Sequence, residues 1–370
     1  MASKNIYLPN LDGIRALAVL FVIVSHVELH KETFGLATSV TYEQHKMLGG
    51  TGVTIFFVLS GFLITYLLFE EKNTSGQVVI RNFYLRRMLR IWPLFFLVLL
   101  VGFSISSGWS WSAVALSIFF LTNGAFVAGM LPAIIDPIWS IGVEEQFYLF
   151  QPHLVKSGQT RRVAINFLVV IFLFYLIKYV CTRLLFPVGS THYTLVTSLF
   201  YFTRFDCMMI GGLGACAFYE FRQLPERATF LSTSFFRPWV KYLFPLLLLA
   251  YLVLYISEKV PFNHQLLALL FLPVVLNLAN DPKGNGLLES WPFKEVGKVS
   301  YGLYLLHKFP LYLVLWAFTN WQIEWGIWNN LTIYAFTLLL SLLLARVSFY
   351  YFEKPFLKLK SRFATLTRPD

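Results

Sequence analysis

The chain has 370 residues, of which 57% are hydrophobic and only 13% are charged. A soluble domain carries about 25% charged residues, so this composition excludes an ordinary soluble protein. The net charge of +11 at pH 7 fits the excess of lysine and arginine in the cytoplasmic loops of membrane proteins better than it fits nucleic-acid binding. We therefore predict an all-α, polytopic membrane protein whose partners include membrane lipids and no nucleic acid.

Eleven apolar segments approach the roughly 20 residues that cross a bilayer. If ten cross and 112–128 is re-entrant or peripheral, every cluster of lysine and arginine lies on one side, as the positive-inside rule requires. Both termini are then cytoplasmic. Thr122, Asn123 and Gly124 suit an interrupted helix, although 137–155 is also polar and is the alternative re-entrant segment. The eleven segments are 12–30, 50–69, 90–107, 112–128, 137–155, 163–184, 196–219, 238–257, 263–279, 297–319 and 328–352.

The domain organisation predicted from these segments is simple. A transmembrane domain occupies 1–356, and a short basic cytoplasmic tail occupies 357–370. The three cysteines lie in or near apolar segments without metal-ligand spacing, so we expect free cysteines. His26 and His30 are four residues apart but lack a third ligand, so we expect no metal site.

The first apolar segment, LDGIRALAVLFVIVSHVELH at 11–30, carries Asp12, Arg15 and His26. Arg15 and His26 are eleven residues apart, which on a helix is about 16 Å of rise on one face. Charged groups within a bilayer are costly and usually face the protein interior or a watery cavity. We interpret this helix as one wall of a cavity, with Arg15 near a mouth and His26 deep inside. The alternative is that Arg15 snorkels to the interface and His26 is a packing residue.

Two further stretches suggest a binding site for phosphates. The segment GGTGVTIFFVLSG at 49–61 ends with Ser60 and a glycine, and its small residues permit close helix approach or contact between backbone and ligand. In RNFYLRRMLRIWP, Arg86 and Arg90 are four residues apart and share a helical face, whereas Arg87 is predicted to point elsewhere. Guanidinium groups bind phosphates bidentately. A positive anchor at the cytoplasmic face is a second, compatible interpretation.

Two adjacent carboxylates, Glu144 and Glu145, lie in the apolar stretch IWSIGVEEQFYLFQP. They are about 100° apart on a helix, so one can face the cavity while the other meets a partner or the interface. Glu144 follows the face of Trp139 and Ser140 more closely. A carboxylate beside an imidazole fixes its tautomer and raises its basicity.

Further polar side chains occur in later apolar segments. Arg204 and Asp206 are two residues apart in FTRFDCMMIGGLG and would not face each other on a regular helix. GKVSYGLYLLHK places Tyr301, Tyr304 and His307 within one segment. These groups either line the cavity and bind a polar acceptor or make interfacial hydrogen bonds. The candidates for the cavity or acceptor site are Asp12, Glu145, Arg204, Tyr301 and His307.

Seven motifs in series resemble the acyltransferase-3 family of bacterial membrane acyltransferases. The likeness covers nearly the whole chain, residues 8–356, and the motifs follow the family's order and spacing. They are LDGIRALAVLFVIVSH, GGTGVTIFFVLSGFLIT, RRMLRIWP, IWSIGVEEQFYL, FTRFD, SYGLYLLH and FEKPF.

The resemblance implies a ten-helix enzyme in the bacterial cytoplasmic membrane that modifies carbohydrate of the cell envelope. Members of this family move an acyl group, commonly acetyl from acetyl-CoA, to carbohydrate hydroxyls. Some carry an additional extracytoplasmic domain, and this chain resembles a stand-alone member. The resemblance also implies that His26 and Arg15 are essential and that Arg86 and Arg90 bind the donor.

The resulting hypothesis is an O-acetyltransferase that uses cytoplasmic acyl-CoA as co-substrate and needs no bound cofactor. His26 is the expected general base on the acceptor hydroxyl. Glu144 is expected to orient His26, and Ser60 is a candidate for stabilising the oxyanion. A covalent acyl-His26 intermediate is a variant of this scheme.

Two other classes compete with the enzyme. A transporter or flippase for polar lipids or small molecules would use His26 and Glu144 as a proton relay. The absence of internal repeats and the arginine cluster count against it. A non-catalytic scaffold would not need Arg15, His26 and the two glutamates within its spans, because such groups are costly there.

Overall fold

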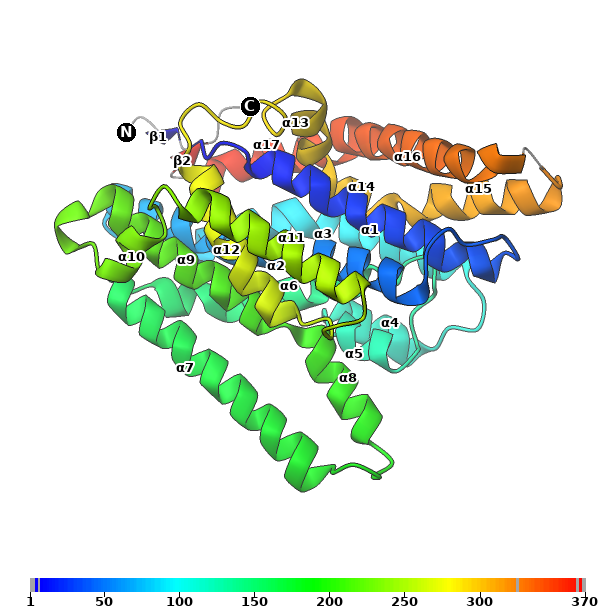
Figure 1. Cartoon of the computed structure of the whole chain (residues 1–370), viewed down its shortest axis with the longest axis horizontal. Coiled ribbons are helices and arrows are strands. Elements are labelled where there is room, and N and C mark those ends of the chain that lie inside the picture. Colours follow the sequence, from blue (N-terminus) through cyan, green and yellow to red (C-terminus); the bar gives the residue numbers. More distant parts are fainter. Residues whose placement is uncertain (1–3, 6, 324–325, 364–365, 368–370) are drawn as a thin grey trace.

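The computed structural model describes residues 4–5, 7–323, 326–363 and 366–367. Within these ranges the chain is helical apart from one pair of two-residue strands (Figure 1). Strands β1 (Lys4–Asn5) and β2 (Leu366–Thr367) pair in parallel, so the two ends of the chain lie together. The predicted all-α class is confirmed for the described residues.

The helices follow one another with short connections. The α-helices are α1 (Leu11–Thr33), α2 (Tyr42–Ser75), α3 (Ile80–Ile105), α4 (Trp111–Ile118), α5 (Thr122–Val127), α6 (Ile138–Val155), α7 (Thr160–Tyr179), α8 (Tyr193–Thr203), α9 (Phe205–Gln223), α10 (Phe230–Ser234), α11 (Val240–Ile256), α12 (His264–Asn280), α13 (Trp291–Lys298), α14 (Ser300–Leu306), α15 (Lys308–Asn320), α16 (Asn329–Val347) and α17 (Lys354–Lys360). Single 3₁₀ or π turns are η1 (Val180–Leu185), η2 (Pro225–Arg227), η3 (Gly326–Trp328), η4 (Ser348–Glu353) and η5 (Ser361–Phe363).

Five helical stretches are long and apolar enough to cross a membrane within the described part of the chain. The first two are the most enclosed, with 61% and 78% of their most apolar windows buried inside the protein. Only 11% of the corresponding window of 160–185 is buried, and Figure 1 shows α7 and α8 diverging from the bundle. Apolar side chains that no protein covers fit a lipid environment. The five stretches are Leu11–Thr33, Tyr42–Ser75, Ile80–Ile105, Thr160–Leu185 and Asn329–Phe363.

Helices α2 and α9 approach each other closely because glycines face backbone at their crossing. A Cβ on Gly61 would lie 1.8 Å from the carbonyl oxygen of Met208. A Cβ on Gly211 would lie 2.1 Å from the carbonyl oxygen of Val58. Small residues permit this approach of helices in membranes. The sequence left two roles open for the glycines of 49–61, helix packing or contact with a ligand. Gly61 serves helix packing.

Three predicted segments are interrupted. Phe120, with φ of 58°, lies between α4 and α5, so 112–128 is the interrupted helix that its polar residues predicted. Segment 196–219 is not one helix, because Arg204 adopts a left-handed conformation, φ 44°, between α8 and α9. Segment 297–319 is likewise divided among α13, α14 and α15.

The C-terminal residues pack against the body near α3. The predicted tail, 357–370, contains the end of α17, η5 and β2, and its residues 364–365 and 368–370 lie outside the described ranges. Lys360 reaches the cavity described below, and the backbone carbonyl of Phe363 accepts a hydrogen bond from Arg86 at 2.8 Å. This segment therefore helps to build the site.

Candidate functional site

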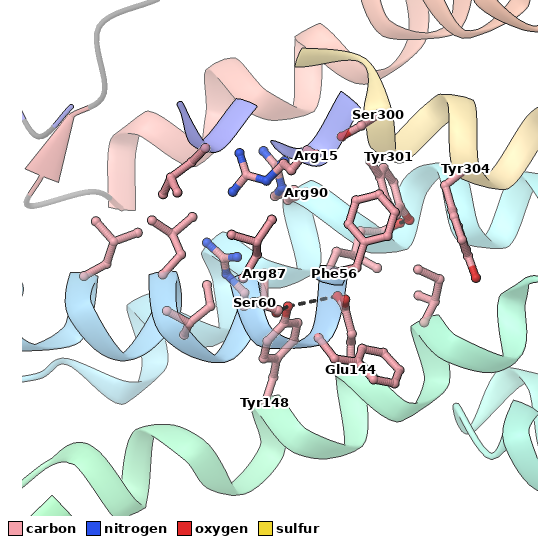
Figure 2. Close-up of a pocket in the computed structure, with 18 of the residues that line it drawn as sticks. Arg15, Phe56, Ser60, Arg87, Arg90, Glu144, Tyr148, Ser300, Tyr301 and Tyr304 are labelled. Carbon is pink, nitrogen blue, oxygen red and sulfur yellow. Dashed lines mark hydrogen bonds between the residues drawn. The ribbon is translucent and has the colours of Figure 1, made fainter. Parts of the chain in front are cut away.

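A cavity of about 260 Å³ lies between α1, α2, α3, α6 and α14. Figure 2 shows Arg15, Arg87 and Arg90 on one side of Tyr301 and Tyr304 on the other. Its polar lining residues are Arg15, Ser60, Glu71, Arg86, Arg87, Arg90, Ser140, Glu144, Tyr148, Ser300, Tyr301, Tyr304 and Lys360. The remaining lining is apolar, with Phe56, Phe57, Leu63 and Ile141 among its members.

One end of the cavity is strongly cationic. Arg15 from α1 forms an ion pair with Asp12 at 2.7 Å, and Arg86 forms one with Glu71 at 2.5 Å. Arg90 from α3 and Lys360 from α17 add two further positive charges. Positive charges that converge on a confined space of low dielectric attract anions strongly.

Arg87 also lines the cavity, which the sequence did not predict. It lines the cavity together with Arg86 and Arg90, so the prediction that it points elsewhere is wrong. Its guanidinium lies over the rings of Phe83 and Tyr148, 6.0 Å and 5.9 Å from their centroids. Its buried Nε has no hydrogen-bond partner within the described residues. A helical wheel places its Cβ about 100° from Arg86, but the long side chain reaches the same space.

The two carboxylates of α6 divide as the spacing predicted. Glu144 lines the cavity and accepts a hydrogen bond from the Tyr148 hydroxyl at 2.9 Å (Figure 2). Glu145 does not line it and accepts a hydrogen bond from Trp92 Nε1 at 2.8 Å. The Ser60 hydroxyl is 2.5 Å from the Tyr148 oxygen and must donate to it, because Tyr148 already gives its proton to Glu144.

His26 meets a different partner from the one predicted. Its Nδ1 is 2.7 Å from Nε2 of His307, and the two rings stack with centroids 5.0 Å apart. Glu144 accepts a hydrogen bond from Tyr148 instead, so the prediction that Glu144 orients His26 is wrong. His307 follows α14, 281 positions later in the chain. No local spacing in the sequence could have paired these two rings.

The cavity ends just before this histidine pair. Phe56, Ser140 and Tyr304 line its inner end, whereas His26 and His307 do not line it. The prediction that His26 lies inside the same cavity as Arg15 is therefore wrong, because aromatic side chains close the cavity before the imidazole. The Tyr304 ring lies 5.8 Å from that of Phe56 and 6.3 Å from that of His307, measured between centroids. Tyr304 and Ser140 share a hydrogen bond of 2.7 Å. One aromatic layer therefore stands between the cationic cavity and the imidazoles.

The other candidate residues take separate positions. Tyr301 lines the cavity and donates to the carbonyl oxygen of Ile91 at 2.6 Å. Arg204 does not line it; its guanidinium is buried among three aromatic rings, the nearest centroid 5.0 Å away. The Asp206 carboxylate accepts hydrogen bonds from Tyr175 and Gln265 instead of pairing with Arg204 in the described structure.

The structure offers no arrangement of metal ligands among its described residues, which contain no group of three or more histidine, cysteine, aspartate or glutamate side chains suited to a metal. All three cysteines, Cys181, Cys207 and Cys216, are free. The charged side chains that line the cavity are the four arginines, Lys360, Glu71 and Glu144, and the histidine pair lies beyond its inner end. The described residues thus form a helical bundle with five stretches long and apolar enough to cross a membrane, and with a cavity lined by several cationic side chains.

The chain belongs to the acyltransferase-3 family. The family's profile, described as an acyltransferase domain, matches residues 8–349. This finding confirms the resemblance on which the sequence analysis relied. No solved structure matches the chain.

Relatives of known sequence carry names of the same kind. A provisionally named O-acetyltransferase of Staphylococcus aureus is 25% identical over 96% of this chain and 58% of its own length. The provisionally named peptidoglycan O-acetyltransferase YrhL of Bacillus subtilis is 28% identical over 94% of this chain and 55% of its own length. The peptidoglycan O-acetyltransferase OatA of Listeria monocytogenes is 32% identical over 40% of this chain and 24% of its own length. The chain therefore spans little more than half of its first two relatives.

Proposed function

We propose that the protein is an O-acetyltransferase of the bacterial cytoplasmic membrane that moves an acetyl group from cytoplasmic acetyl-CoA to a hydroxyl of an envelope carbohydrate. The observation that carries this proposal is the cavity that begins at a cluster of arginines and ends one aromatic layer from His26. The family and the names of its relatives support acyl transfer as the chemistry.

The arginines provide the site for the donor. Arg15, Arg86, Arg87 and Arg90 would bind the phosphates of acetyl-CoA through charge-assisted hydrogen bonds. The apolar part of the cavity, with Phe57 among its residues, would then accept the pantetheine arm. Along α1 the distance from Arg15 to His26 is about 16 Å, which suits that arm.

His26 would act as general base on the acceptor. The acceptor oxygen attacks the thioester carbonyl carbon, and His26 removes its proton. The tetrahedral intermediate then collapses, the carbon–sulfur bond breaks, and the proton passes to the CoA thiolate. For this transfer the thioester must pass Phe56 and Tyr304, which close the inner end of the cavity in the structure.

The positions of the arginines and His26 also support a donor and an acceptor that reach the site from opposite sides of the membrane. Both terminal strands lie at the end of the molecule where α17 meets the arginines, which fits ten crossings with cytoplasmic termini. His26 lies toward the other end of α1. An acceptor would reach it from the extracytoplasmic side, and the carbohydrate class is suggested by the two relatives named for peptidoglycan.

The experiment that tests this function compares envelope glycans from cells with and without the gene by mass spectrometry. Loss of an acetyl mass on deletion, restored by the wild-type gene and not by His26→Ala, is the expected result. Restoration by His26→Ala would contradict the role of His26 as general base. Unchanged glycans after deletion would contradict an envelope carbohydrate as the acceptor. Purified protein that moves a polar lipid without releasing CoA from acetyl-CoA would instead support a transporter.

A further inference from the structure

The histidine pair has a hydrogen-bond order that can be worked out from its partners. Nδ1 of His307 is 2.8 Å from the backbone carbonyl oxygen of Tyr304. A carbonyl oxygen only accepts hydrogen bonds, so His307 Nδ1 carries the proton. In a neutral ring the other nitrogen, Nε2, then has the free lone pair and accepts.

The partner of that lone pair is His26. Its Nδ1 lies 2.7 Å from His307 Nε2 and must donate, because two lone pairs would repel at this distance. A neutral His26 with its proton on Nδ1 has its lone pair on Nε2. The carbonyl of Tyr304 therefore determines, through His307, which nitrogen of His26 can take a proton from another molecule.

We propose that His307 is a positioning residue that holds His26 in the tautomer with a protonated Nδ1 and an unprotonated Nε2. The proposal rests on the proposed role of His26 and specifies the atom at which it acts. When His26 Nε2 removes a proton from an acceptor hydroxyl, the resulting imidazolium keeps its Nδ1–H on the lone pair of His307. The hydrogen bond then becomes charge-assisted and stronger.

The surroundings of His307 suit a fixed role. Its side chain is fully buried, and its ring lies within 10° of the plane of His26. Its backbone is also held on both sides: its N–H donates to the carbonyl oxygen of Leu303, and its carbonyl oxygen accepts from the N–H of Leu311. The ring therefore has little freedom to turn.

Nearby charges do not compete for the pair. The ammonium of Lys308 is held by Asp136 at 2.5 Å and by the carbonyl of Ala133 at 2.9 Å. The carboxylate of Glu144 is occupied by Tyr148. An acidic partner that could have oriented His26 in the usual way is thus engaged elsewhere, and a second imidazole takes its place.

The first test reads the tautomer directly and needs no substrate. The whole protein is prepared in lipid nanodiscs with isotopically labelled histidine, and nitrogen NMR distinguishes protonated from unprotonated ring nitrogens. The signals of His26 are those absent from a His26→Gln sample. We expect Nε2 of His26 to be unprotonated in the wild type. In His307→Phe, which keeps an aromatic ring but removes both nitrogens, we expect protonated Nε2 to appear.

A matched control removes a different imidazole from the same cluster. His30 lies 6.3 Å from His26 between ring centroids and makes no hydrogen bond to it in the described structure. His30→Phe should leave the His26 signals unchanged. A protonated Nε2 in the wild type, or the same change in both variants, would overturn the proposal and leave the general-base role of His26 untouched.

The second test measures the reaction. His307→Phe should lower kcat by about 10²-fold, the lower range for general-base catalysis, while the KM for acetyl-CoA stays within about twofold. His307→Gln, whose amide oxygen can accept from His26 Nδ1, should recover part of kcat. Equal loss in both variants, or a loss that falls on KM, contradicts a positioning role. Absence of acetyl transfer in the wild type would instead contradict the proposed function.

Discussion

Arg87 gives the sharpest prediction at the scale of single residues. Its guanidinium enters the cavity, and its buried Nε lacks a hydrogen-bond partner in the described structure. Because a charge-assisted hydrogen bond contributes about 1.5–3 kcal/mol, Arg87→Ala should weaken binding of acetyl-CoA by about 10- to 100-fold. The affinity is measured by isothermal titration in detergent or nanodiscs.

Arg81 supplies the matched control for this experiment. It lies on the same helix, α3, but is exposed and does not line the cavity. Arg81→Ala should leave the affinity for acetyl-CoA unchanged at moderate salt. Similar losses in both variants would mean that the protein attracts the donor by its general positive charge and not through a defined site.

The sequence predicted site residues where chemistry and helical spacing sufficed. Arg15, Ser60, Arg86, Arg90 and Glu144 were predicted as donor-binding or catalytic residues, and all five line the cavity. Of the residues predicted for the cavity or acceptor site, Tyr301 lines it, whereas Asp12, Glu145, Arg204 and His307 do not. The reach of Arg87 and the partner of His26 could not be predicted. The reach of Arg87 depends on the path of a long side chain. The partner of His26 depends on a contact between two residues that are 281 positions apart in the chain.

At the scale of elements, the close crossing of α2 and α9 depends on glycine. Gly61→Ala would place its Cβ 1.8 Å from the backbone oxygen of Met208, so the helices must separate. Overpacking of this kind costs about 1–3 kcal/mol. We expect a lower melting temperature in detergent, measured by the intrinsic fluorescence of the tryptophans.

The control for this variant is Gly124→Ala. Gly124 lies within α5, and an added Cβ there meets no atom within 4 Å. Its melting temperature should equal or exceed that of the wild type, because alanine favours helix over glycine. Equal destabilisation by both variants would contradict the crossing described here.

A buried ion pair near the end of α1 is also hydrogen-bonded to α16. Lys31 Nζ lies 2.5 Å from Glu28 Oε1 and 2.7 Å from Asn330 Oδ1, and the side chains of the pair are fully buried. Lys31→Met leaves Glu28 as an uncompensated charge, which should lower the free energy of unfolding by about 3–5 kcal/mol. Chemical denaturation in detergent measures the loss.

An exposed pair provides the comparison. Lys241 lies 3.3 Å from Asp281, and the two side chains are 52% and 26% exposed. Lys241→Met should cost at most about 1 kcal/mol, because water screens the pair. If both lysine variants lose the same stability, burial does not govern these ion pairs.

Helix boundaries show what sequence patterns could not predict. Polar residues at 122–124 predicted the interruption between α4 and α5. The break at Arg204 carries no such sign, because arginine rarely adopts a positive φ. Packing of the buried guanidinium among Trp139, Tyr201 and Phe202 accompanies this conformation.

At the scale of the whole molecule, the proposed topology makes a prediction about sidedness. With ten crossings, the loop that follows α2 is cytoplasmic and the loop between α7 and α8 is extracytoplasmic. Gln77 and Thr191 are exposed in these loops. In a background carrying Cys181→Ser, a membrane-impermeant thiol reagent added to whole cells or spheroplasts should label Thr191→Cys and not Gln77→Cys.

Inverted vesicles give the reverse pattern and serve as the control. Labelling of both cysteines from the same side would contradict ten crossings. In that case the positively charged loops would not share one face, and the arginine cluster could not be assigned to the cytoplasm from charge alone.

The central claim is that donor binding and chemistry are separate events at two ends of one path. Arg87 and its neighbours lie at the first end, and His26 lies beyond Phe56 and Tyr304 at the second. A variant of His26 should therefore still bind the donor while failing to transfer its acetyl group.

The most direct measurement follows radiolabelled acetyl-CoA with purified His26→Ala in nanodiscs, recording donor affinity and acetyl transfer in the same preparation. We expect a donor affinity within about twofold of the wild type and a fall in acetyl transfer of at least about 10²-fold. Transfer at the wild-type rate by His26→Ala would contradict it.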